Sequence, residues 1–101
     1  MKLSDYLEKI GHGCSLVSDG TFATLEQCTR IRGERALTYL ETPKYAYALE
    51  DPRISCVICA PEVQALISAH VSGVAVTESP KAAFFTLHNY LVRHREKRPT
   101  V

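Results

Sequence analysis

The stretch ALTYLETPKYAYALE, residues 36–50, shows an arrangement that recurs along the chain. An apolar run, ALTYL, is followed by the pair Thr42-Pro43 and then by a helical pattern up to about Asp51. Proline suits the first position of a helix, because the N–H that it lacks has no partner there, and threonine is common just before that position. The stretch therefore predicts a strand that leads directly into a helix.

The same order of elements occurs twice more. The later copies are ISCVIC (54–59) before Ala60-Pro61, and GVAV (73–76) before Ser79-Pro80 with a helix to about His94. Strands that alternate with helices of this length indicate right-handed crossovers and a parallel sheet. The predicted fold class is α/β, with a small, mainly parallel sheet and crossover helices.

The residues before these copies predict a helix and a hairpin. Apolar residues recur at helical spacing from Leu3 onward and predict a short amphipathic helix over residues 5–10. Two short apolar segments, 14–18 and 21–25, flank Asp19-Gly20, a pair that favours two-residue hairpin turns. We therefore expect an N-terminal helix-hairpin unit packed onto the sheet.

Composition points to one ordinary globular domain. The chain has 101 residues, of which 46% are hydrophobic and 23% charged, and its formal net charge is +1. This charge gives no reason to expect nucleic acid as a partner, and no apolar run approaches the roughly 18 residues of a membrane span. We expect a cytoplasmic protein with an α/β domain over residues 1–92 and a basic linker or frayed tail over 93–101.

The four cysteines, Cys14, Cys28, Cys56 and Cys59, are too few and too unevenly spaced for a secreted disulfide framework, so reduced thiols are expected. The pair Cys56 and Cys59 has the spacing of a redox motif or half a zinc site. In a strand, however, residues three apart point to opposite faces, which separates the two sulfurs. We expect no metal site and no cofactor.

Candidate binding residues lie where the first of the three strands ends. In parallel sheets ligands bind beyond the carboxyl ends of the strands. Tyr39 and Tyr45 could hold a flat heterocycle between their rings, and stacking of a base contributes roughly 1–3 kcal/mol per ring. Thr42 could add a hydrogen bond and Lys44 a contact to phosphate. A nucleotide site is one hypothesis; packing of the tyrosine rings under a loop is the alternative.

Three segments, 37–50, 54–63 and 73–87, carry a resemblance to a known family. Their order and spacing are similar to the N-terminal domain of UDP-3-O-(3-hydroxyacyl)glucosamine N-acyltransferase, an enzyme of lipid A biosynthesis, and the likeness covers most of residues 1–92. The family pattern runs roughly Leu-Ser-Phe-Leu, Asn-Pro-Lys-Tyr, an apolar strand ending in prolines, and a later Asn-Pro before a helix.

The resemblance implies a domain that binds the uridine of a UDP-sugar, with the uracil between two aromatic side chains. Tyr39 and Tyr45 match these two aromatic positions, and Lys44 matches the lysine of the pattern. Thr42 replaces the family's asparagine, and one hydroxyl does not reproduce an amide that both donates and accepts. The resemblance thus implies Tyr39, Thr42 and Tyr45 at the uracil, and Lys44 keeps the phosphate contact expected above from its charge.

The resemblance also implies that this chain is not catalytic alone. In the family a histidine on a β-helix of hexapeptide repeats performs acyl transfer, and no such repeat is present in these 101 residues. The four histidines match no catalytic position of the family: His12, His70, His88 and His94. Acyl carrier protein is expected to bind only through that missing domain, and the fragment is expected to be a monomer, with a homotrimer possible only in a full-length protein. A non-catalytic structural or interaction module that lost its ligand is the open alternative.

Overall fold

The computed structural model describes residues 2–10, 13–26, 31 and 33–96, with the side chains described up to residue 93. The elements in chain order are α1 (Leu3–Ile10), β1 (Ser15–Ser18), β2 (Thr24–Leu25), β3 (Ala36–Leu40), η1 (Pro43–Glu50), β4 (Ile54–Cys59), η2 (Pro61–Leu66), β5 (Gly73–Val76) and α2 (Pro80–Glu96). Both η elements are 3₁₀-helices.

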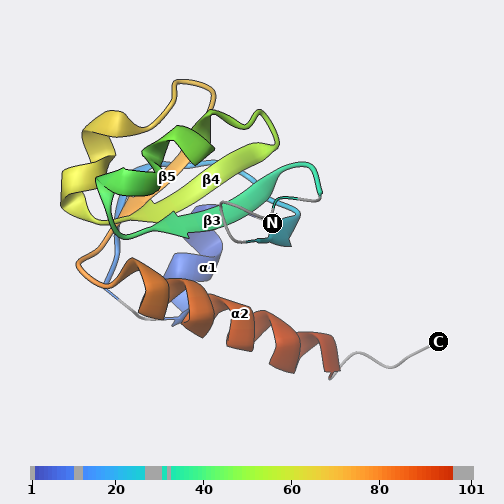
Figure 1. Ribbon diagram of the computed structural model, residues 1–101. Helices are drawn as coiled ribbons and strands as arrows, with labels where there is room; N and C mark the ends of the chain where they lie inside the picture. The colour runs from blue at the N-terminus through green and yellow to red at the C-terminus, as the bar shows by residue number, and fades with distance from the viewer. Residues whose placement is uncertain (1, 11–12, 27–30, 32, 97–101) are drawn as a thin grey trace.

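The strands form one mixed sheet in the order β1-β5-β4-β3-β2. The four strands β2, β3, β4 and β5 run parallel to one another, and β1 is antiparallel to β5. Each step from β3 to β4 and from β4 to β5 passes through one of the 3₁₀-helices (Figure 1). The predicted α/β class with a mainly parallel sheet and crossover helices is confirmed.

The three helices that follow these strands begin at the predicted prolines, Pro43, Pro61 and Pro80. The first two are 3₁₀ rather than α-helical. A 3₁₀-helix rises about 2.0 Å per residue and an α-helix about 1.5 Å, so the same number of residues covers more distance in 3₁₀ turns. Winding of this kind helps a short connection return across the sheet.

The predicted hairpin is wrong. β1 and β2 lie at opposite edges of the sheet, so they do not pair with each other. The Asp19-Gly20 pair instead binds the start of α1. The Asp19 carboxylate accepts hydrogen bonds from the Ser4 N–H at 3.1 Å and the Ser4 hydroxyl at 2.9 Å, and the Leu3 N–H donates to the Gly20 carbonyl oxygen at 2.9 Å. The polar groups of the Asp19-Gly20 pair thus bind the start of α1 and do not form a hairpin turn between β1 and β2.

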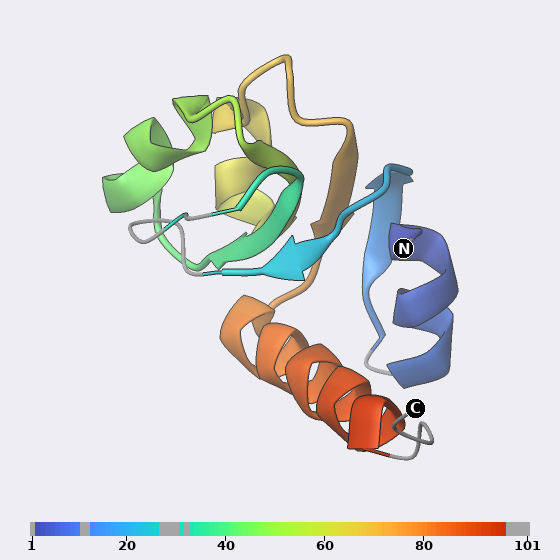
Figure 2. The same cartoon turned by 90° about the vertical axis from the view of Figure 1, so that its right-hand side faces the viewer.

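Helices cover both faces of the sheet, with η1 and η2 on one face and α1 and α2 on the other (Figures 1 and 2). Along β4 the side chains alternate between two buried clusters: Val57 and Cys59 pack on the side of η1 and η2, whereas Cys56 and Ile58 pack with α1 and α2. The expectation that Cys56 and Cys59 face opposite sides is confirmed, and both are free thiols. Burial raises the pKa of the Cys59 thiol to about 11.

Helix α2 runs to Glu96 and so passes residue 92, where the domain was expected to end. The remaining tail residues, 97–101, lie outside the described residues. Among the helices in the described part of the chain, none has both the length and the apolar character that crossing a membrane requires.

Candidate functional site

The predicted binding residues lie at the carboxyl edge of the parallel strands. β3 ends at Leu40 and η1 begins at Pro43, so Thr42, Lys44 and Tyr45 follow this edge directly. η2 and α2 likewise begin just after β4 and β5 end. This edge is the part of an open parallel sheet that usually binds ligands.

Thr42 stands just before η1 but does not cap it with its side chain. Its backbone is extended, with φ −134° and ψ 153°, and its hydroxyl makes no hydrogen bond to the helix N–H groups. A threonine at this position often accepts such a bond. Thr42 is exposed, so its hydroxyl remains accessible at the surface beside the end of β3.

Tyr45 and Tyr47 form an exposed aromatic pair on η1. Their ring centroids are 6.3 Å apart with an interplanar angle of 51°, and the residues are 41% and 67% exposed. The ammonium Nζ of Lys44 lies over the Tyr45 ring, 5.5 Å from its centroid. A polar surface that combines aromatic rings with a cation suits a flat, anionic molecule.

Tyr47 was not among the binding residues predicted from the sequence. Residues two apart do not face each other on a regular helix. Tyr45, however, has non-helical backbone angles, φ −106° and ψ 15°, which divide η1 into two turns. This kink accounts for the contact between the two rings, and the only signal in the sequence was the clustering of tyrosines.

Tyr39 approaches the same edge from the other face of the sheet. Its half-buried ring packs with α2, where the centroids of Phe84 and Phe85 lie 4.8 and 5.9 Å away. η1 packs on the opposite face, so Tyr39 and Tyr45 are held by different layers of the fold. A ligand that contacts both rings has to reach over the carboxyl end of β3. Phe85 is 37% exposed and was not among the predicted site residues.

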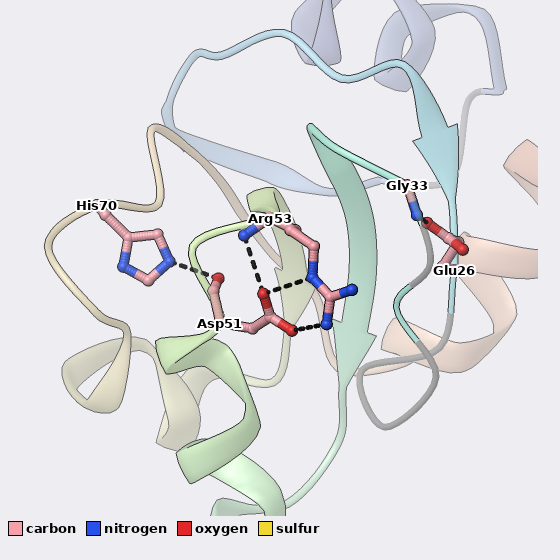
Figure 3. A network of polar contacts seen from close by, with 5 residues as sticks. All are labelled: Glu26, Gly33, Asp51, Arg53 and His70. Atoms are coloured by element: carbon pink, nitrogen blue, oxygen red, sulfur yellow. Dashed lines mark hydrogen bonds and ion pairs between the residues drawn. The ribbon is translucent and has the colours of Figure 1, made fainter.

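A separate polar network lies near the start of β4, at the amino edge of the parallel strands (Figure 3). The Asp51 carboxylate accepts two hydrogen bonds from the Arg53 guanidinium, from Nε at 3.0 Å and from Nη2 at 2.7 Å, and one from the Arg53 backbone N–H at 3.0 Å. These bonds lower the pKa of Asp51 to about 2. The network fixes the turn between η1 and β4.

Two further groups in Figure 3 have local bonding roles. The His70 Nε2 lies 2.8 Å from the Asp51 carbonyl oxygen, and the Glu26 carboxylate accepts hydrogen bonds at 3.0 Å from the Gly33 N–H and from the Thr24 hydroxyl. His70 is exposed, as expected of a surface residue. These contacts bind loops to each other and form no arrangement of nucleophile and base.

Metal binding finds no support in the described residues, which contain no group of three or more His, Cys, Asp or Glu side chains able to hold an ion. Cys28, one of the four cysteines, lies outside the described residues, as do the side chain of His94 and all of His12.

Comparisons with protein-family models, with curated proteins and with solved structures found no match to this chain.

Proposed function

We propose that this chain binds the uridine part of a UDP-sugar, a UDP-glucosamine derivative, as the N-terminal domain of an N-acyltransferase of lipid A biosynthesis in the cytoplasm. The observation that supports this most is the exposed group Thr42, Lys44 and Tyr45 directly after β3. Catalysis, acyl carrier protein binding and trimer formation belong to a further domain in this proposal, and neither metal nor cofactor is needed for binding.

Each residue has a defined chemical task in the proposed complex. The uracil stacks on Tyr45 on one side and meets Tyr39 on the other, while the Thr42 hydroxyl bonds to an oxygen or N–H at the edge of the base. Lys44 pairs with the diphosphate. Stacking on two rings contributes roughly 2–6 kcal/mol before the costs of association are subtracted, so we expect weak binding.

An NMR titration of the isotope-labelled protein tests the proposal. The ligands are UMP and UDP-N-acetylglucosamine, with CMP and AMP as controls for the base. Saturable shifts at Thr42, Lys44 and Tyr45 with the uridine ligands alone would support a uridine site. A Tyr45→Leu variant should lose these shifts, whereas Tyr6→Leu, a change on α1 at the other face, should keep them. Absence of shifts up to millimolar ligand would contradict the proposal.

A non-catalytic interaction module is the second candidate, and edge strand β1 favours it. All four residues of β1 are exposed, including Leu16 and Val17, and an edge strand offers backbone groups to a partner. This candidate gains support if the titration shows no ligand and hydrogen exchange at β1 slows when a cell extract is added.

A further inference from the structure

One face of the Tyr45 ring is already occupied in the free protein. The Lys44 ammonium lies over this ring, within the distance of about 6 Å at which a cation is attracted by an aromatic face. Because Tyr45 is 41% exposed, solvent reaches the ring from outside, and the lysine can leave without rearrangement of the core. The contact is therefore weak and reversible.

In the described part of the chain no carboxylate forms an ion pair with Lys44. Within the residues that the structure describes, the ion pairs join Lys2 to Asp19 and Arg53 to Asp51, and neither includes Lys44. The ammonium is therefore not tied to another side chain when an anion arrives. A phosphate group can offer a stronger attraction than the neutral ring, because it carries a formal negative charge.

A base that stacks on the covered face of Tyr45 has to displace this lysine. Breaking an exposed cation–π contact should weaken binding by about two- to fivefold, which corresponds to about 0.5–1 kcal/mol at 1.4 kcal/mol per tenfold change. For a nucleoside, nothing offsets this loss of affinity. A nucleotide regains it when the released ammonium meets its phosphate.

We propose that Lys44 is a displaceable cover of the Tyr45 ring, and that it makes this site select nucleotides over nucleosides with the same base. The inference rests on the proposed uridine binding and adds a specificity-determining residue to that site. The lysine opposes every base that stacks on the covered face and repays that cost only to ligands that carry a phosphate.

The test compares the affinities of uridine and UDP, measured by NMR titration, for the wild type and for Lys44→Met. In the variant uridine should bind about two- to fivefold more tightly, since no cation has to leave the ring. UDP should lose the phosphate contact, which as an exposed ion pair accounts for roughly 1.4- to 5-fold in affinity. UDP is likewise spared the displacement of the cation, so this gain is common to both ligands, and the ratio of the two dissociation constants should fall by roughly 1.4- to 5-fold, the size of the phosphate contact.

Lys9→Met is the matched control, because Lys9 Nζ lies over the Tyr6 ring at 5.1 Å in the same kind of contact but on α1, at the opposite face of the sheet. This variant should leave both affinities unchanged. Lys44→Arg keeps a cation that can both cover a ring and bind phosphate, so it should retain the preference for UDP.

The outcomes separate this inference from the proposed function. If UDP binds the wild type but Lys44→Met leaves uridine affinity unchanged or weaker, the covering role is wrong and the uridine site stands. If neither uridine nor UDP binds the wild type or the variant, the proposed function fails and the inference with it. An equal change in Lys9→Met would show a general charge effect and overturn the specific role of Lys44.

Discussion

Replacing Thr38 by valine should stabilise this protein, although threonine to valine usually costs stability in a core. Thr38 lies in the middle of β3, opposite Val57 of β4, and its side chain is fully buried. Its hydroxyl oxygen has no hydrogen-bond partner in the described part of the chain. Such a group loses its bonds to water on folding and gains none in return.

The expected gain follows from this missing partner. An unsatisfied buried hydroxyl costs about 1–3 kcal/mol, and valine replaces it by a methyl group of similar size while keeping the branched side chain that strands favour. We therefore expect Thr38→Val to raise the free energy of unfolding by about 1–2 kcal/mol. For about 100 residues this corresponds to a rise in Tm of roughly 5–10 °C.

Urea unfolding followed by circular dichroism measures this change, and an unchanged m-value would show that the unfolded state is not affected. Thr77→Val is the matched control, because Thr77 is also buried but its hydroxyl oxygen accepts a hydrogen bond from the Ser79 N–H at 3.3 Å. That variant should be less stable than the wild type. If Thr38→Val were destabilised to the same extent as Thr77→Val, the Thr38 hydroxyl would have a partner and the reasoning would be refuted.

Two other predictions concern polar contacts and close packing. The pKa of Asp51 falls from 3.8 to about 2, so the stability that it contributes should be lost as the pH drops from about 4 to 2. Asp51→Asn should flatten this part of a plot of urea midpoint against pH; an unchanged slope would mean that other carboxylates dominate. Gly20→Ala should lower Tm by 10 °C or more, on the order of 2 kcal/mol, because its Cβ would lie 2.6 Å from the Gly73 backbone nitrogen. Gly33→Ala, with its nearest contact at 3.4 Å, should change Tm much less, and equal losses in both variants would contradict this explanation.

The three strands β3, β4 and β5, each followed by a helix, could be predicted from the sequence because their signals are local, whereas the parallel pairing of β2 with β3 was missed. Pro43, Pro61 and Pro80 each mark a helix start by their own backbone chemistry, and the apolar run before each marks a buried strand. The pairing of β1 could not be predicted in this way. It joins residues such as Leu16 and Ala75, which are far apart in the sequence, and nothing near Leu16 specifies that partner.

The sequence predicted which residues lie at the candidate site, but not how their side chains contact one another. The order of strand and helix correctly predicted that Thr42, Lys44 and Tyr45 follow the end of β3. The position of Lys44 over a ring and the neighbouring Tyr47 depend on side-chain packing at a kink, which no periodicity encodes. Likewise, Tyr39 packs against α2, a contact that depends on how β3 and a helix about forty residues later meet.

The strand order also has a consequence for protein synthesis. Of the elements described here α1 and β1 leave the ribosome before the others, yet in the described part of the chain β1 pairs with β5 and α1 packs on α2, at the far end of that order. The contiguous part from β2 to β5, including both 3₁₀-helices, can pair strand by strand as it is made. The N-terminal residues must wait, and until residues 73–96 have left the ribosome β1 lacks its pairing with β5, and Leu3 of α1, buried in the finished fold, is open to chaperones or to wrong partners.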